Sequence, residues 1–593
     1  MISKISIRAA ALLAAVSLTA AACGGSSSGG PILGPGFDLA SSKILNPSTH
    51  TGGTIKLVSS SIGGFDSLDP GDTSESATWD LFRTFGRTVL GFAHKPGLAG
   101  DELQGDLADG VGTPSADGLT WTYKLRSGAT FEDGTAITAK DIAWAIERSN
   151  WSTVHTNAPS YFINLLTPSD DARTKQFSTW DVYKKGPLPG GVIDYTDPAK
   201  LVFHLPRPFG EFNYLMTLPA TMPVPFERDV KDPTGYANHP IASGAYKIAS
   251  YTAGTDLKLV RNTNYNTNSD PLGEHPAYAD GYDVQLGLAA ADRDQRLLDN
   301  TVDADIDGPL TVATHQQVLI DPTLKSQVDD SSDSSLVYAA LNVNVIPDIN
   351  CRKAIEYGTN KQTVLNEFGG KYGGQIATSM LPPSIPGHVA FDDYPNVPDE
   401  AIRALSKCRA AGAKGFDAQG HFHTTIVAQT NNPDLDNAAV AMQTSLQNVG
   451  IVADIVLYPF AQYSSSFAGE TLFANTHGLG IILTTWIPDW PSGYGFMDQI
   501  ITKDGISLPG VGGGSNYAQF DDPGVDQLIE SALATSDTSR QRQIWGDVDQ
   551  KVMAQAVEVP LVNRNVMRFR SSKLTNVMIG AYGAYDLSVL GKS

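Results

Sequence analysis

Hydrophobic and polar residues alternate in several short segments of this chain. Between Leu119 and Phe131, the residues Trp121, Tyr123 and Leu125 fall on one face and polar residues on the other. This period of two predicts a half-buried strand. Thr54–Val58 alternates in the same way and predicts the first strand.

Other segments have the spacing of amphipathic helices. After Thr138, the apolar residues Ile142 and Ile146 recur at a spacing of four, and Asp141 stands three residues after the threonine, as in a capping box. Later, the segment "DNAAVAMQTSLQNVG" predicts an amphipathic helix that ends at Gly450 and precedes a strand.

Two further alternating segments, Ser243–Tyr251 and Thr255–Tyr265, predict a hairpin. Helices and strands therefore mix along the whole chain, which favours an α/β class. No fixed-period repeat is present, which excludes a solenoid or propeller.

The composition limits the number of lobes and the class of partner that the protein can bind. The chain has 593 residues with 41% hydrophobic content, too many for a single core, so two or three lobes are expected. Without residues 1–22 it carries 40 basic and 63 acidic residues, a net charge of -23. A surface this acidic repels polyanions, and a nucleic-acid partner is not expected.

The N-terminus predicts export. Lys4 and Arg8 precede the short apolar stretch Ala9–Leu18, and an alanine run leads into Cys23. This pattern resembles a bacterial lipoprotein signal, so we expect residues 1–22 to be removed and Cys23 to carry the acyl chains. The Gly-, Ser- and Pro-rich residues 23–49 are predicted to form a flexible tether. The alternative is an ordinary signal peptide with a chance cysteine near its cleavage site.

Motifs for catalysis or cofactor binding are missing or trivial. The one G-x-S-x-G pattern, at residues 25–29, lies in the tether, and the glycine run at 510–515 lacks the lysine of a phosphate-binding loop. His421 and His423 stand two apart without an evident carboxylate or cysteine partner, which favours a surface strand over a metal site. We therefore expect no enzyme activity, no cofactor and no metal.

Several segments, in their order, resemble the extracytoplasmic solute-binding proteins of peptide-type ABC importers (family 5). The most specific is "DGLTWTYKLRSGATFEDGTAITAKDIAWAIER". The others are "GGTIKLV" with "FDSLDP", "HPIASGAYKI", "CRKAIEYGTNK" and "SNYAQFDDPGVDQLIESAL".

The resemblance implies a two-lobed periplasmic-binding-protein-like fold (type II, cluster C) with an extra small domain on lobe I. We place lobe I at residues 50–93, 213–338 and 560–593. The extra domain is expected at 94–212 and lobe II at 339–559.

The resemblance also implies a ligand site at "LTTWIPDWPSGYGFM". Peptide-binding members carry Trp-x-x-Asp at the cleft, which Trp486 and Asp489 match. There the aspartate pairs with the ligand's α-ammonium group and the tryptophan walls a side-chain pocket, while the neighbouring Trp490 offers a second indole face. Pro488 and Pro491 limit backbone freedom around the acid. The alternative is that both tryptophans are core residues and Asp489 caps a turn.

Further ligand-binding residues are expected at Phe460, where relatives often have a pocket aromatic, and at Tyr463 and Glu75. The alternatives are core aromatics and a solvated acidic loop. Cys351 and Cys408 are either one disulfide or two buried thiols; the resemblance places their helices on one lobe, which makes a disulfide a reasonable hypothesis.

One position departs from the family. At Leu483, three residues before Trp486, some oligopeptide binders have an arginine that meets the peptide carboxylate. A ligand that is not a peptide, such as a sugar or a metal chelate, stays open, and a secreted hydrolase is the rival from another class.

The sequence thus predicts a monomeric, lipid-anchored receptor on the extracytoplasmic face of the cell membrane. It would capture a peptide or other small solute by hinge closure and deliver it to the transmembrane subunits of an ABC permease.

Overall fold

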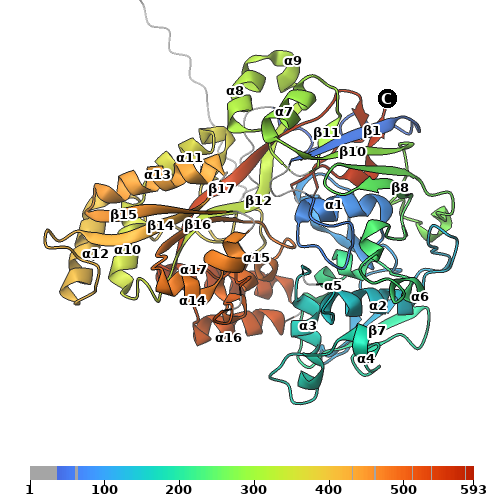
Figure 1. Ribbon diagram of the computed structural model, residues 1–593, viewed down its shortest axis with the longest axis horizontal. Coiled ribbons are helices and arrows are strands. Elements are labelled where there is room, and N and C mark those ends of the chain that lie inside the picture. Colours follow the sequence, from blue (N-terminus) through green and yellow to red (C-terminus); the bar gives the residue numbers. More distant parts are fainter. Residues whose placement is uncertain are drawn as a thin grey trace, which may run out of the picture. The chain divides into compact units, whose positions relative to one another are not determined.

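A computed structural model describes residues 37–60, 65–155, 157–306, 308–430, 432–459, 462–510, 512–535, 537–580 and 583–593. Parallel and antiparallel strand pairs occur together, with helices between them, and this confirms the predicted α/β class (Figure 1). Among the described residues, no helix combines the length and apolar character needed to cross a membrane.

The region that we call lobe I is built on one sheet in the order β11-β1-β10-β9-β8. Ile55 and Leu57 of β1 are fully buried in the apolar cluster of this lobe, as their alternation predicts. β8 and β9 pair antiparallel, which confirms the predicted hairpin. The elements are β1 (Thr54–Ser60), α1 (Ser76–Phe85), β8 (Tyr246–Thr252), β9 (Asp256–Arg261), β10 (Gly281–Leu288), α7 (Ala290–Leu298), β11 (Ala304–Asp305), α8 (Val312–Ile320), α9 (Pro322–Lys325), β18 (Leu574–Thr575) and β19 (Gly591–Lys592).

The extra domain has its own sheet, in the order β4-β5-β7-β6, and its own apolar cluster. Trp121 and Tyr123 of β5 are buried in that cluster, and the predicted capping box of Thr138 and Asp141 is present at the start of α2. The elements around this cluster, which include β2 and α6 from outside the predicted range 94–212, are β2 (Leu90–Phe92), β3 (Leu103–Gly105), β4 (Thr113–Pro114), β5 (Thr120–Lys124), α2 (Ala139–Asn150), α3 (Tyr161–Leu166), α4 (Val182–Lys185), β6 (Ile193–Asp194), β7 (Lys200–His204), α5 (Phe212–Leu215) and α6 (Phe226–Asp229).

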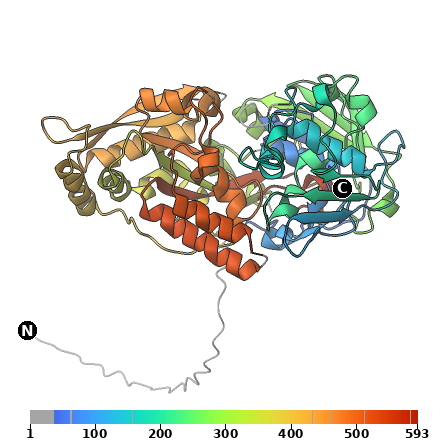
Figure 2. The ribbon, with the colours of Figure 1, turned by 90° about the horizontal axis from the view of Figure 1, so that it is seen from below.

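Lobe II is built on the sheet β13-β17-β12-β16-β14-β15, covered by helices such as α16 and α17, which lie side by side (Figure 2). The predicted helix before Gly450 is α13, and this glycine has φ 88°, the left-handed conformation that ends helices. The elements are β12 (Val328–Leu341), α10 (Ile349–Gly358), α11 (Lys361–Glu367), β13 (Gly374–Ile376), α12 (Pro398–Ala410), β14 (Phe422–Thr430), α13 (Pro433–Gln447), β15 (Ile451–Pro459), α14 (Thr471–Thr476), β16 (Ile481–Trp486), α15 (Gly493–Ile501), α16 (Pro523–Leu533), α17 (Thr538–Ala554) and β17 (Glu558–Phe569).

Two long strands, β12 and β17, run from one lobe into the other (Figure 1). Val328 and Phe569 lie at their lobe I ends and share an apolar cluster with Val58 of β1, whereas Leu336 and the residues after it belong to lobe II clusters. A bulge interrupts the pairing between Ser332 and Leu336, and Ser334 within it has φ 61°. A bulge leaves a residue out of the ladder and bends its strand, so the crossing is irregular at this point.

The predicted tether extends too far toward the C-terminus. Phe37 and Ala40 are buried, the backbone amides of Leu39 and Ala40 donate to Asp329 of β12 at 3.1 Å, and Leu45 bridges Val577. Residues 37–45 therefore pack against the folded lobes, because their apolar side chains join buried apolar clusters there. The predicted signal peptide and Cys23 lie outside the described residues.

Candidate ligand site where the extra domain meets lobe II

The loop that carries Asp489 is fixed at both ends. It leaves β16 at Trp486 and enters α15, whose N-cap Ser492 accepts a hydrogen bond from the Gly495 amide at 3.0 Å. The Asp489 amide donates to the Gly495 carbonyl at 3.2 Å, which closes the loop on the first turn of the helix.

The Asp489 carboxylate faces the extra domain. It is half-buried and accepts a hydrogen bond from the hydroxyl of Tyr161, the first residue of α3. Burial raises the pKa of Asp489 to about 6, and the Tyr161 hydrogen bond opposes that rise only partly. A carboxylate in this setting is under-compensated, and a cation placed beside it would relieve the cost of burying its charge.

Trp486, at the start of the same loop, has an indole N–H that makes no hydrogen bond to the described residues. Its ring is half-buried against the lobe II core, and its buried indole N–H has no hydrogen-bond acceptor among the described residues. A buried donor without a partner is destabilising unless something supplies an acceptor. An oxygen-bearing ligand would do so.

Trp490 has a different environment from the predicted one. The side chain is 0% exposed and belongs to the apolar cluster of the extra domain. Its ring lies 4.9 Å from that of Tyr161 and 6.1 Å from that of Tyr214, and its N–H donates to Glu211 at 2.8 Å. Trp490 is therefore an interface residue here and offers no free indole face to a ligand.

Tyr463 is likewise part of the core. It is 2% exposed, and its hydroxyl donates to the carbonyls of Leu483 at 2.9 Å and Val427 at 3.3 Å, two strands of the lobe II sheet. The expectation of a pocket residue is not met in this structure because those buried carbonyls take the hydroxyl. Phe460 lies outside the described residues.

Glu75 immediately precedes α1 but does not cap it. No hydrogen bond or ion pair of its carboxylate is found among the described residues, and burial, with a contribution from Asp66, raises its pKa to about 7. The side-chain amide of Asn157 donates to Asp66 at 2.9 Å. Since Tyr161, the partner of Asp489, follows four residues later, this extra-domain segment joins the lobe I loop to the Asp489 loop.

A cavity of about 440 Å³ adjoins Tyr161, between the extra domain and lobe II. Its lining includes Tyr494, Arg207, Lys503 and the buried carboxyl of Asp498, whose pKa burial raises to about 7. This volume falls in the range of small-molecule sites, and its walls offer both apolar rings and charges.

Leu483 packs on the other side of the β16 strand. It is fully buried in a lobe II cluster and pairs with Ala339 of β12. The position that departs from the family is therefore a core position in this chain, with no cation to meet a carboxylate.

The two histidines of the 421–423 segment have a partner that the sequence analysis missed. Asp417 Oδ2 lies 3.1 Å from His421 Nδ1 and 3.0 Å from His423 Nε2, across the turn that precedes β14. A tight turn brings residues four and six apart together, which strand spacing alone does not suggest.

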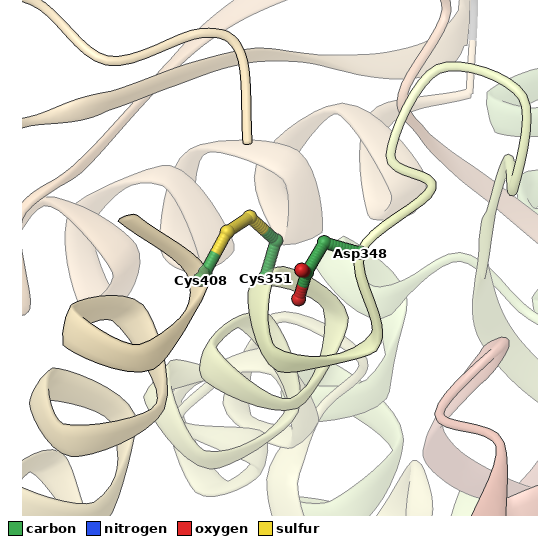
Figure 3. A group of neighbouring side chains, drawn as sticks. All are labelled: Asp348, Cys351 and Cys408. Carbon is green, nitrogen blue, oxygen red and sulfur yellow. A yellow bond between two sulfur atoms is a disulfide. The ribbon is translucent and has the colours of Figure 1, made fainter. Parts of the chain in front are cut away.

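Cys351 and Cys408 are joined by a disulfide between α10 and α12, with 5.2 Å between their Cα atoms (Figure 3). Asp348 lies beside them and caps α10 through the Asn350 amide. Within the described ranges, only these three side chains bring three potential ligand atoms within 4.8 Å of one another. Because the sulfur atoms are bonded to each other, no thiolate is available there for a metal.

Tyr161 and Glu211 were not identified from the sequence. Tyr161 lies 328 residues from Asp489, and Glu211 lies 279 residues from Trp490. Neither stands in a local motif, so no signal within one segment pointed to them.

Comparisons with known proteins show the family and the fold of the chain. A model of the family described as bacterial extracellular solute-binding proteins, family 5 Middle, matches residues 102–507. The chain is 24% identical over 511 residues to the probable D,D-dipeptide-binding periplasmic protein DdpA of Escherichia coli K12, covering 84% of this chain and 86% of that protein.

Solved structures show the same fold. The clavulanic acid biosynthesis oligopeptide binding protein 2 matches with a TM-score of 0.86 and 33% identity, over 95% of this chain and 99% of that one. DppA from Helicobacter pylori, solved with the peptide STSA, matches with a TM-score of 0.68 and 18% identity, over 90% and 98%. These likenesses confirm the predicted two-lobed fold of type II periplasmic binding proteins.

Proposed function

Because the chain belongs to the bacterial extracellular solute-binding proteins of family 5, we propose that it is a non-enzymatic receptor for an extracellular peptide. It would close around the peptide by bending at the β12–β17 crossing and present it to the permease of an ABC importer. Cys23 would carry the lipid anchor that holds the receptor, as a monomer, at the outer face of the cell membrane.

The observation that carries this proposal is the setting of Asp489. An α-ammonium group would pair with its carboxylate, and the Trp486 N–H, which has no acceptor in the described part of the chain, would donate to a ligand carbonyl. The carboxylate of Glu75, for which no hydrogen bond or ion pair is found among the described residues, would contact the ligand from lobe I. Tyr161 also lines the cavity described above, although Asp489, Trp486 and Glu75 do not, and that cavity would hold a side chain of the peptide.

The names of the relatives support a peptide over other solutes. One is named for D,D-dipeptides, one for oligopeptides, and one was solved with a peptide. A non-peptide solute is the second candidate, and the buried Leu483 favours it, because the arginine that meets a peptide carboxylate in some relatives has no counterpart at that position.

The first experiment identifies the ligand. Native mass spectrometry of the purified protein would reveal a co-purified solute, and a peptide is expected. A sugar or metal chelate of matching mass would instead establish the second candidate.

The second experiment tests the role of Asp489 with that peptide by calorimetry. Asp489→Asn keeps the shape and removes the charge, and leaving a buried ammonium unpaired costs about 3–5 kcal/mol, roughly 200- to 5,000-fold in Kd. Acetylating the peptide's N-terminus should weaken binding to the wild type similarly and binding to the variant much less, because both changes delete one interaction.

The matched control is Asp547→Asn, which removes the same charge from an exposed position on α17. Its affinity should equal that of the wild type. Unchanged affinity in Asp489→Asn would return the aspartate to a turn-capping role, and equal losses on acetylation for both proteins would place the amine elsewhere.

A further inference from the structure

Glu211 joins the extra domain to the Asp489 loop. It lies just before α5 and is 2% exposed. One oxygen, Oε2, accepts hydrogen bonds from the Trp490 indole N–H at 2.8 Å and from the Ser492 hydroxyl. The donors are the residues on either side of Pro491, one and three positions after Asp489.

The carboxylate is also close to a second indole. The N–H of Trp545 lies near enough to Glu211 to lower its pKa, although the contact lacks the geometry of an ordinary hydrogen bond. Burial dominates and raises the pKa of Glu211 to about 7. Trp490, Ser492 and Trp545 all belong to lobe II, whereas Glu211 belongs to the extra domain.

Neighbouring residues fix the same contact. The Gly210 amide donates to the Leu533 carbonyl at the end of α16 at 2.7 Å, and a Cβ at residue 210 would approach that oxygen to 3.1 Å. The ring of Phe209 packs edge-on against Tyr494 with centroids 5.1 Å apart. Residues 209–211 are therefore seated on lobe II as a unit, and glycine at 210 permits the close approach.

The result is a reciprocal pair of contacts. Lobe II supplies Asp489, which accepts from Tyr161 of the extra domain, and the extra domain supplies Glu211, which accepts from Trp490 and Ser492 of lobe II. Separating these surfaces would leave the acceptor and its donors to find other partners and would expose an indole that is 0% exposed here.

We propose that Glu211 is a positioning residue that latches the Asp489 loop to the extra domain. Its acceptor oxygen fixes Trp490 and Ser492, and through them the direction of the Asp489 carboxylate. The significance for ligand capture rests on the function proposed above, but the latch itself is a property of the protein without ligand.

Hydrogen exchange of the full-length, ligand-free protein, followed by mass spectrometry, tests the latch. Glu211→Ala should accelerate amide exchange in residues 486–495 at least tenfold. Glu211→Gln retains one acceptor oxygen and should restore most of the protection. A role confined to folding of the extra domain would accelerate exchange there and leave 486–495 unchanged, which would overturn the proposal.

The matched control is Glu147→Ala. Glu147 is also a buried carboxylate of the extra domain, 0% exposed, with one hydrogen bond, from the Leu188 amide at 3.1 Å. This variant should leave exchange in 486–495 as in the wild type. Equal acceleration by the Glu147 and Glu211 variants would show that any loss of a buried acid has this effect and would refute the latch.

Trp490→Phe tests the same contact from the lobe II side and keeps the proposal testable if Glu211→Ala does not fold. It removes the indole N–H and keeps an aromatic ring, so exchange in 486–495 should rise, and adding Glu211→Ala should raise it less than it does in the wild type. Full additivity would contradict the latch. Since no ligand enters these measurements, a failed latch and a failed peptide-binding proposal remain distinguishable.

Discussion

Removing the Cys351–Cys408 disulfide should loosen lobe II specifically. The bond joins α10 to α12 within an apolar cluster, and the two cysteines are 1% and 0% exposed. The double variant Cys351→Ala, Cys408→Ala deletes the cross-link without leaving a polar group in that cluster.

The magnitude follows from the loop that the bond closes. The cysteines are 57 residues apart, and the loop-entropy relation gives about 4 kcal/mol of stabilisation at 25 °C. This is an upper figure, because native strain and residual structure in the unfolded chain subtract from it. A loss of that size corresponds to roughly a thousandfold in an equilibrium constant for opening.

Hydrogen exchange in α10 and α12 measures that loss locally, which matters because a protein of several lobes need not unfold in one step. Protection there should fall in the double variant and, equally, in wild-type protein reduced with a phosphine, while protection in the extra domain stays unchanged. Identical protection with and without the bond would refute the reasoning, and two free thiols found by alkylation of unreduced, denatured protein would refute the bond itself.

Three other changes have defined outcomes. In the folded protein the pKa of Asp489 is about 6, above its ordinary value of 3.8, so the stabilisation from its protonated form is complete below about pH 4 and is lost as the pH rises through 6. Thermal melts of ligand-free protein should therefore show the wild type losing stability relative to Asp489→Asn between these pH values. Parallel curves for the two proteins would contradict the raised pKa. Arg148→Met should lower stability by about 3–5 kcal/mol in denaturant titrations, because it removes the buried guanidinium that pairs with the carboxylates of both Asp69 and Asp229. A loss below 1 kcal/mol would show that those acids take up protons at little cost. Cys23→Ser should release the protein from membranes into the medium in cell fractionation. Continued retention at the membrane would refute the predicted lipid anchor at Cys23.

Local patterns in the sequence predicted local structure well. The alternation at Trp121 and Tyr123 became β5, and the capping box of Thr138 and Asp141 became the start of α2. These features depend on residues within one or two turns of each other, where side-chain period and backbone hydrogen bonding are coupled directly.

Contacts between distant segments were not predictable in the same way. Tyr463 stands after a strand, as a pocket aromatic would, but its hydroxyl is taken by Leu483 and Val427 across the sheet. Trp490 reads as a ligand-facing ring beside Asp489, yet the extra domain, some 280 residues earlier, buries it. Such roles depend on which surfaces meet in the fold, and residue type and spacing within one segment do not determine that.

The energetics of Asp489 connect recognition with closure. At neutral pH, enclosing this carboxylate against Tyr161 without a cation opposes its ionised form, as its raised pKa indicates. A ligand ammonium would reverse the sign of that term, because an adjacent opposite charge favours the ionised carboxylate. The prolines at 488 and 491 limit the freedom of the loop to turn the carboxylate back to water. A bound ligand would therefore favour the arrangement in which Asp489 is enclosed over one in which it faces water, which is the differential interaction that a ligand needs in order to shift a conformational equilibrium.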